Sequence, residues 1–86
     1  MANVEIYTRN LCWFCDRARK LLNARGIPFR EYNASHEPDR RAEMIERSGR
    51  KTFPQVFIDG RHIGGSDDLV AFDRSGELER TLAKAS

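Results

Sequence analysis

The sequence predicts an α/β fold in which a four-stranded mixed sheet is flanked by helices, and two patterns carry that prediction. The first is a strand, a helix and a second strand within about 30 residues, which indicates two parallel strands joined by a right-handed crossover. The second is a pair of short apolar runs around Asp59-Gly60, which indicates an antiparallel hairpin because these residues tolerate the positive φ angles of a tight turn. Together they give the order β-α-β-α-β-β-α-α.

The parallel unit occupies the first part of the chain. "VEIYT" at 4–8 alternates apolar and polar residues, as a half-buried strand does. Apolar residues at helical spacing then predict a helix over 13–25, and Gly26 fits the position that ends it. A second strand is expected at 27–32. Pro28, near its start, indicates that this strand lies at a sheet edge.

The remainder of the chain supplies the hairpin and three more helices. Pro38 suits a first helical position, so we expect a helix from there to Ser48. The hairpin covers 55–63. Ser66 is expected to cap the next helix, which Gly76 ends, and a short amphipathic helix completes the chain.

Length and composition restrict the class of protein. The 86 residues allow one domain, expected to span 1–86, and 40% apolar with 33% charged residues is ordinary for a small soluble globular protein. A net charge of +2 is too small to indicate a nucleic-acid partner. No apolar run approaches the roughly 20 residues of a membrane helix, so no membrane partner is expected. No secretory signal is visible, and we therefore expect a cytoplasmic protein.

The two cysteines of the chain stand three apart, in "CWFC" at 12–15. Cys12 is expected at the amino end of the first helix and Cys15 one turn further on, within reach of a disulfide bond. Free helix amides and the helix dipole favour a thiolate at Cys12 over one at Cys15, and Arg9 adds positive charge nearby. We therefore expect Cys12 to attack as the nucleophile and Cys15 to resolve the mixed disulfide.

A structural disulfide and a metal site are the alternatives for this cysteine pair. Reducing conditions in the cytoplasm disfavour a structural disulfide. Zinc needs three or four protein ligands, whereas the pair supplies two, and His36 and His62 match no short zinc spacing. We assign no metal ligand and expect His62 at the surface of the hairpin. A CxxC beside a βαβ unit is typical of a thioredoxin-like redox motif, so redox catalysis is the favoured interpretation.

The chain resembles the glutaredoxin family, specifically the small bacterial dithiol type, nearly from end to end. The resemblance rests on the order of the elements and on "VEIYT" before "CWFC", "EMIERSGRKTFPQVFI" and "GRHIGGSDDL". It implies a thioredoxin fold and an enzyme, a glutathione-dependent thiol–disulfide oxidoreductase. Such an enzyme uses glutathione as co-substrate to reduce protein–glutathione mixed disulfides and protein disulfides. Its expected partners are glutathione and these proteins, and the chain is expected to be a monomer.

The resemblance also implies a glutathione site. Pro54 would be cis, and Phe53 before it would pair its backbone with that of the ligand. Arg9 stands where similar glutaredoxins carry Lys and is suited to a bidentate contact with the glycine carboxylate. Lys51 is either part of this basic rim or a solvated residue. The residues assigned to glutathione are Arg9, Phe14, Lys51, Thr52, Phe53, Pro54, Gly65, Ser66, Asp67 and Asp68.

The "GGSDD" stretch would hold the γ-glutamyl end of the ligand. Gly65 would let it approach the backbone closely. Helix amides near Ser66 and Asp67 would hold the carboxylate. The ammonium would meet a carboxylate, for which the resemblance favours Asp68, with Asp67 as the alternative.

Trp13 and Phe14 depart from the Cys-Pro-Tyr-Cys of dithiol glutaredoxins, which alters the surroundings of the thiolate but not the class of reaction. Trp13 is expected to be exposed beside Cys12, where it either contacts the protein half of a substrate or only covers apolar surface. Some glutaredoxins without that proline hold a 2Fe–2S cluster between two chains. The alternative function is therefore a cluster-bound dimer, a carrier or sensor in which Cys12 and glutathione are the ligands.

Overall fold

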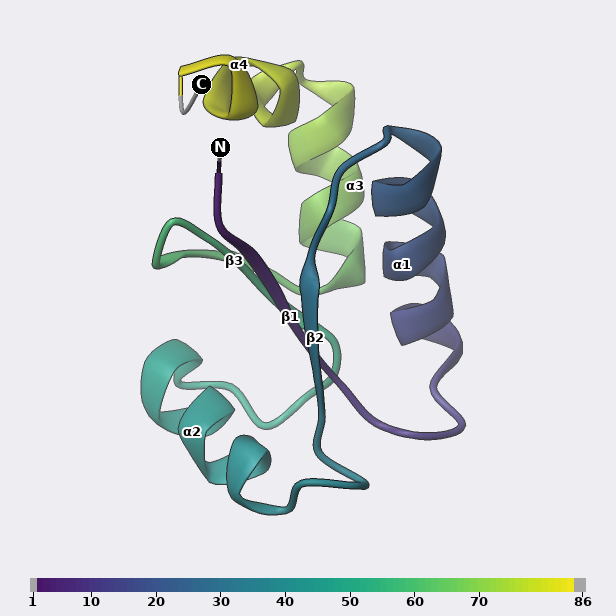
Figure 1. The fold of residues 1–86 in the computed structure, drawn as a ribbon, viewed down its shortest axis with the longest axis vertical. Coiled ribbons are helices and arrows are strands. Elements are labelled where there is room, and N and C mark those ends of the chain that lie inside the picture. Colours follow the sequence, from purple (N-terminus) through teal and green to yellow (C-terminus); the bar gives the residue numbers. More distant parts are fainter. Residues whose placement is uncertain (1, 85–86) are drawn as a thin grey trace.

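The computed structural model describes residues 2–84 as a four-stranded sheet with helices on both faces (Figure 1). The elements are β1 (Val4–Thr8), α1 (Trp13–Ala24), β2 (Arg30–Asn33), α2 (Asp39–Ser48), β3 (Gln55–Ile58), β4 (Arg61–Gly64), α3 (Ser66–Arg74) and α4 (Glu77–Lys84). Their order confirms the predicted one. No helix in this part of the chain has both the length and the apolar character needed to cross a membrane.

The sheet has the strand order β2-β1-β3-β4. β1 is parallel to β2 and antiparallel to β3, which is antiparallel to β4. β2 is therefore an edge strand, as Pro28 predicts. It begins at Arg30, later than expected, because Ile27 is used elsewhere: its N–H donates to the Leu22 carbonyl at the end of α1, and its side chain packs in the core.

The predicted hairpin connects β3 and β4. Asp59 and Gly60 take the positive φ angles of the tight turn, 50° and 81°. The Asp59 carboxylate accepts a hydrogen bond from the Asn3 N–H at 2.8 Å, and the Asn3 carbonyl accepts one from the Asp59 N–H at 2.9 Å. The turn is thereby tied to the segment that leads into β1.

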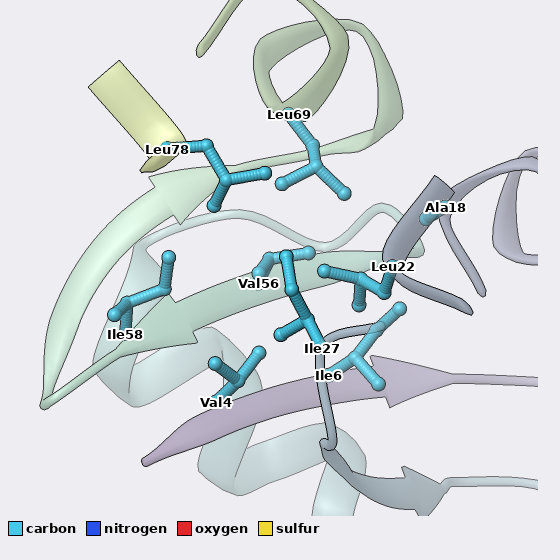
Figure 2. Packing of buried hydrophobic residues seen from close by; sticks show 9 residues of the cluster. All are labelled: Val4, Ile6, Ala18, Leu22, Ile27, Val56, Ile58, Leu69 and Leu78. Carbon is cyan, nitrogen blue, oxygen red and sulfur yellow. The ribbon is translucent and has the colours of Figure 1, made fainter. Parts of the chain in front are cut away.

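Helices α1 and α3 cover one face of the sheet and α2 covers the other (Figure 1). The first face carries an aliphatic core in which side chains of the strands meet those of α1, α3 and α4 (Figure 2). This core contains Val4, Ile6, Ala18, Leu22, Ile27, Val56, Ile58, Leu69 and Leu78. The second face buries Tyr7, Met44 and Phe57. The alternation along β1 separates the two cores, since Ile6 faces one and Tyr7 the other.

Candidate functional site

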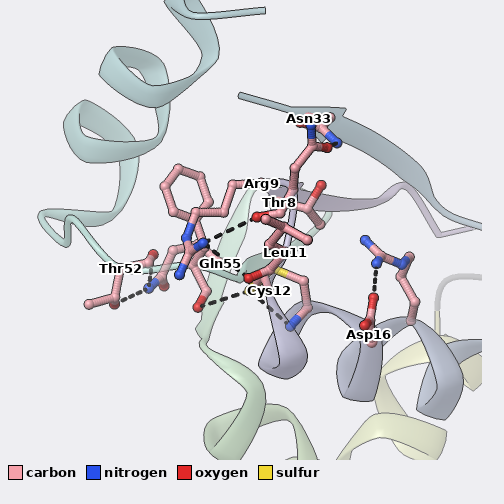
Figure 3. The surroundings of a disulfide bond; sticks show 12 residues. Thr8, Arg9, Leu11, Cys12, Asp16, Asn33, Thr52 and Gln55 are labelled. Carbon is pink, nitrogen blue, oxygen red and sulfur yellow. Dashed lines mark hydrogen bonds and ion pairs between the residues drawn. A yellow bond between two sulfur atoms is a disulfide. The ribbon is translucent and has the colours of Figure 1, made fainter. Parts of the chain in front are cut away.

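The two cysteines form a disulfide at the amino end of α1, and their Cα atoms are 5.2 Å apart (Figure 3). Cys12 is the residue that caps the helix, with an extended backbone, and its Sγ accepts a hydrogen bond from the Cys15 N–H at 3.2 Å. This is the placement that the spacing predicts. A negative charge on this sulfur would be stabilised by the same N–H and by the helix dipole.

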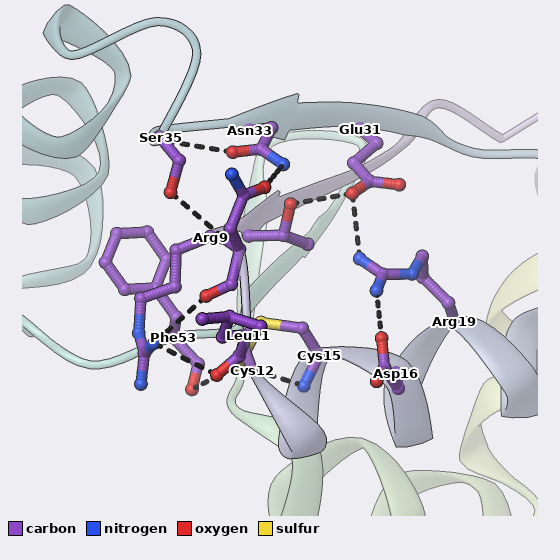
Figure 4. Close-up of polar contacts among 12 residues, drawn as sticks. Arg9, Leu11, Cys12, Cys15, Asp16, Arg19, Glu31, Asn33, Ser35 and Phe53 are labelled. Carbon is purple, nitrogen blue, oxygen red and sulfur yellow. Dashed lines mark hydrogen bonds and ion pairs between the residues drawn. A yellow bond between two sulfur atoms is a disulfide. The ribbon is translucent and has the colours of Figure 1, made fainter.

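The two sulfurs differ in how well they can be reached. Cys15 has no exposed surface, whereas 6% of the surface of Cys12 is exposed. The Cys12 Sγ lies 3.9 Å from the carbonyl oxygen of Phe53, in the loop before β3 (Figure 4). Only Cys12 therefore presents a sulfur to an incoming group.

A tight turn leads from β1 into the cysteine pair. Leu11 has a φ of 52°, and its side chain is 99% exposed. One nitrogen of the Arg9 guanidinium, Nη1, donates to the carbonyls of Asn10 and Leu11 at 3.1 and 3.3 Å (Figure 4). The Asn10 N–H donates to the Ser35 hydroxyl at 2.9 Å, which ties the turn to the loop after β2. The segment before Cys12 is thus fixed from two sides.

A groove of about 670 Å³ lies beside the disulfide. It is lined by Arg9, Phe14, Arg41, Arg50, Lys51, Thr52, Phe53, Pro54, Gly65, Ser66, Asp67 and Asp68. The structure therefore brings together all ten residues that the sequence assigns to glutathione. Sequence analysis missed Arg41 and Arg50. Arg50 adjoins Lys51 and could have been included on that ground, whereas Arg41 reaches the groove from α2 and belongs to no motif.

The loop before β3 forms one wall of the groove, and the Phe53–Pro54 peptide bond in it is cis. Behind the loop, the fully buried side chain of Gln55 donates from its Nε2 to the carbonyl and the hydroxyl of Thr52, at 3.0 and 3.2 Å (Figure 3). A buried amide with satisfied hydrogen bonds holds a single conformation. The wall is therefore fixed from behind.

His62 continues this network, and the expectation that it lies at the surface is wrong. It is half-buried, with its Nε2 2.7 Å from the Gln55 Oε1 and its ring centroid 5.0 Å from that of Phe57. Burial, and secondly the positive charge of Arg50, lower the pKa of His62. A neutral, hydrogen-bonded imidazole therefore supports the groove wall from inside the fold.

The amino end of α3 forms the opposite wall, and it is not capped as expected. Ser66 was expected to cap the helix, but Gly65 occupies that position and its N–H donates to the Asp68 carboxylate at 2.9 Å. The Ser66 Oγ is buried and has no hydrogen-bond partner within residues 2–84. A Cβ on Gly65 would lie 3.3 Å from the Pro54 carbonyl oxygen, so a small residue lets the two walls approach.

Both carboxylates of the groove form ion pairs, whereas most of its cations do not, within the described part of the chain. Asp68 forms an ion pair with Arg50 at 2.9 Å, and Asp67 forms one with Arg17 at 2.7 Å. The Gly65 N–H, and secondly Arg50, lower the pKa of Asp68, which keeps this carboxylate ionised at neutral pH. The other three cations of the groove, Arg9, Arg41 and Lys51, form no ion pair with the described part of the chain. They are free to meet an anionic ligand.

These features define a class of protein: a thiol–disulfide oxidoreductase with a thioredoxin fold. A sulfur pair at a helix end, one member of it reachable, lies beside a cis-proline loop and a groove for a charged ligand. The chain belongs to the glutaredoxin family, whose model matches residues 4–63. It is a dithiol glutaredoxin with glutathione-dependent oxidoreductase activity, in which Cys12 and Cys15 form the active-site pair. The expectation drawn from the resemblance is confirmed.

Relatives and solved structures agree with this assignment. Glutaredoxin 3 of Escherichia coli strain K12 is 52% identical over 82 residues, which cover 95% of this chain and 99% of the relative. A glutaredoxin of Pseudomonas aeruginosa is 41% identical over 83 residues, with 96% and 99% covered. The solution structure of glutaredoxin from Brucella melitensis matches with a TM-score of 0.84 and 50% identity, over 100% and 94% of the two chains. The crystal structure of a buckwheat glutaredoxin–glutathione complex matches with a TM-score of 0.88 and 29% identity, over 96% and 78%.

Proposed function

We propose that the groove beside Cys12 binds glutathione and that the chain, as a monomer in the cytoplasm, reduces protein–glutathione mixed disulfides and protein disulfides. One observation carries the proposal: the groove combines three cations that form no ion pair within residues 2–84, two carboxylates and the amino end of α3, directly beside the reachable sulfur. Glutathione carries two carboxylates, one ammonium and an extended backbone. The similarity to a buckwheat glutaredoxin in complex with glutathione adds support.

The γ-glutamyl end of glutathione suits the amino end of α3. Free amides near Ser66 and Asp67 can donate to its carboxylate, as helix ends do for anions. The buried Ser66 Oγ, which has no partner within the described chain, supplies a further hydroxyl at this wall. The ionised Asp68, or the more exposed Asp67, would receive the ammonium.

The glycine end suits the basic side of the groove. Arg9 and Lys51 were assigned to it from the sequence, and Arg41 of α2 joins them in the groove lining. A guanidinium binds a carboxylate with two parallel hydrogen bonds. Between the two ends, the backbone of Phe53 would pair with that of the ligand. Phe14 and Thr52 complete the lining, so every group of glutathione has a partner of suitable chemistry.

Reduction of a protein–glutathione mixed disulfide takes two exchange steps. The Cys12 thiolate attacks the sulfur of the glutathionyl group, the mixed disulfide breaks, and the protein thiolate leaves and takes up a proton. Cys12 then carries the glutathionyl group. The thiolate of a second glutathione attacks that sulfur, which releases glutathione disulfide and restores the Cys12 thiolate. In net terms, one mixed disulfide and one free glutathione thiol become one protein thiol and one glutathione disulfide, and the enzyme is unchanged.

Protein disulfides use the second cysteine. Cys12 attacks one sulfur of the substrate, and Cys15 then displaces the protein from Cys12, which forms the Cys12–Cys15 disulfide that the structure contains. The substrate leaves with two thiols, and two glutathione molecules reduce the enzyme again. The buried position of Cys15, one helical turn from Cys12, suits a group that reacts only within the chain.

Single cysteine variants test this division of labour. Cys12→Ser should abolish the reduction of both kinds of substrate, because the one other cysteine of the chain, Cys15, is buried. Cys15→Ser should keep most of the activity on mixed disulfides, since glutathione replaces the resolving thiol, and should lose the reduction of protein disulfides. Steady-state rates on a glutathionylated protein and on a protein disulfide measure this. Equal loss in both variants would refute the assignment.

The cluster-bound dimer receives no support from the geometry. Its two chains would have to approach each other closely at Cys12, where the Trp13 side chain projects with 69% of its surface exposed. We therefore leave it as an alternative that absorption spectra decide. A protein purified without oxygen that absorbs in the visible range and contains iron and sulfide would reinstate the 2Fe–2S function, with Cys12 and glutathione as ligands.

A further inference from the structure

The large exposed hydrophobic residues within residues 2–84 are neighbours in the chain, on either side of the nucleophile. They are Leu11, Trp13 and Phe14, which are 99%, 69% and 49% exposed. Scattered exposed apolar residues are ordinary, but a group of them is typical of a surface that binds a partner. Trp13 is also held in place, because its ring packs edge-to-face against that of Phe14, with centroids 5.2 Å apart.

Leu11 is the most unusual member of this group. Its φ of 52° is sterically unfavourable for leucine, whereas glycine or asparagine would adopt it with little strain. The almost fully exposed side chain also contributes no packing to the fold. Leucine at this position therefore has both an unfavourable backbone angle and an apolar side chain exposed to water. Neither feature stabilises the fold.

The reaction indicates what these side chains meet. A mixed disulfide at Cys12 has a glutathione half and a protein half. The glutathione half, in the proposed function, occupies the groove, whose lining includes Phe14 but neither Leu11 nor Trp13. The protein half must then extend from Cys12 over surface outside the groove, and the exposed side chains of Leu11 and Trp13 belong to the two chain neighbours of Cys12.

We propose that Leu11 and Trp13 form a docking surface for the protein half of the substrate and that it selects proteins with an apolar residue next to the target cysteine. An aliphatic or aromatic side chain in that position would be buried against both residues, which favours association. This inference rests on the proposed function, because it assigns the groove to glutathione. It adds a preference among protein substrates that the groove itself does not supply.

Arg9 connects the docking surface to the groove. It lines the groove, and its Nη1 holds the Leu11 carbonyl as well as that of Asn10 (Figure 4). A guanidinium has five N–H donors, so a carboxylate can bind the others while these two bonds remain. A lysine ammonium has three donors on one nitrogen and cannot form the same fork. The same turn therefore supplies Arg9 to the glutathione half of the substrate and Leu11 to the protein half.

Three substrates test the proposal, and each of them is a mixed disulfide of glutathione. Two are glutathionylated peptides of equal length that differ only in the residues beside the cysteine, leucine in one and serine in the other. The third is the mixed disulfide of glutathione with 2-mercaptoethanol, which has no protein half. We expect the parent chain to show a kcat/KM about tenfold higher for the leucine peptide than for the serine peptide.

Leu11→Asn and Trp13→Ser should remove most of this preference and change kcat/KM for the small disulfide by less than about twofold. Both variants should fold, since asparagine tolerates positive φ and both side chains are exposed. Asp59→Asn is the matched control: it has a φ of 50°, lies in the hairpin turn, and should leave all three rates unchanged.

Four outcomes would overturn the inference. The parent could treat the two peptides alike, or the variants could lose activity on all three substrates equally, which would assign these residues to the active site itself. A concentration-dependent dimer of the parent, lost in Trp13→Ser by size-exclusion chromatography, would assign the surface to a second copy of the chain. Failure of the parent on every glutathione mixed disulfide would refute the proposed function together with this inference, whereas the first three outcomes leave the glutathione-dependent activity itself intact.

Discussion

The two faces of the sheet are stabilised by different interactions. The face covered by α1, α3 and α4 has a core of aliphatic side chains from nine buried residues. The face covered by α2 buries two aromatic rings and Met44, the one buried residue of that helix. Ile45 of the same helix packs against this cluster as a partly buried side chain, and the helix adds polar contacts with the sheet.

Arg47 is the centre of that polar contact. It forms an ion pair with Glu5 of β1 at 3.1 Å, donates to the Tyr7 hydroxyl at 2.9 Å, and places its guanidinium carbon 4.0 Å from the centroid of the Phe57 ring. The Tyr7 hydroxyl in turn donates to Glu43 of α2. One helix therefore adds a network of charges and hydrogen bonds to a small apolar contact, whereas the large aliphatic core lies under the other helices.

This difference separates two parts of the site. The reactive sulfur and the amino end of α3 stand on the aliphatic face, whose stability depends little on pH or salt. Arg41 stands on α2, whose attachment depends on both. Conditions that weaken α2 should therefore weaken the basic side of the groove before they affect the disulfide.

The largest expected effect is on the aliphatic face. Leu22→Ala removes a fully buried side chain of α1 and should lower the free energy of unfolding by about 2–5 kcal/mol. Urea unfolding followed by circular dichroism measures it. The loss should be the same at low and high salt, since no charge is involved, and a strong dependence on salt would contradict the comparison.

A smaller loss is expected on the α2 face. Arg47→Met keeps much of the packing over Phe57 but leaves Glu5 without its cation, and should cost about 1–3 kcal/mol at low salt. The cost should shrink in 1 M NaCl, because salt screens the lost attraction. Arg25→Met is the matched control, since its pair with Asp73 is formed by a largely exposed guanidinium and should contribute little to stability. An equal loss of unfolding free energy in both variants would show that the α2 network contributes no more than an exposed ion pair.

The smallest effect is a dependence on alkaline pH. Burial, and secondly the hydrogen bond to Glu43, raise the pKa of Tyr7 to about 12, against about 10 in the unfolded chain. Above pH 10 the unfolded chain loses this proton first, so stability is complete below that pH and falls between 10 and 12. The expected loss is about 1 kcal/mol by pH 11.

Comparison of the parent with Tyr7→Phe isolates this contribution, provided that both are kept oxidised so that no thiol titrates. The difference in unfolding free energy between them should shrink as the pH rises from 9 to 11. Tyr32→Phe is a necessary second variant, because burial and Glu5 raise the pKa of Tyr32 as well. A constant difference between the parent and Tyr7→Phe would mean that Tyr7 titrates normally.

Local patterns predict most of the fold, because each element here is specified by nearby residues. The helical spacing after Cys12, the Asp59-Gly60 turn and the edge position implied by Pro28 are of this kind. The prediction failed at the start of α3. Ser66 was expected to cap this helix, but Gly65 occupies that position, and its hydrogen bond to the Asp68 carboxylate exists only in the folded chain.

The candidate site shows the same limit. Eight of the ten assigned residues come from the cysteine motif, "TFP" and "GGSDD", which each place their side chains locally, and Arg9 and Lys51 stand close to these motifs in the chain. Arg41 and the support of the groove by His62 come from contacts between distant elements, which no spacing in the sequence encodes. Long-range contacts of single polar side chains were therefore the part that sequence analysis could not supply.

The burial of Cys15 has a consequence for damage by oxidants. A peroxide can reach only Cys12, so the first oxidation product, a sulfenic acid, should form on that sulfur. The Cys15 thiol, whose Cα is 5.2 Å from that of Cys12, can condense with it at once, which forms the disulfide and releases water. Glutathione then reduces this disulfide, whereas sulfinic and sulfonic acids cannot be recovered in that way. We therefore expect the concealed thiol to spare the reactive one from irreversible oxidation.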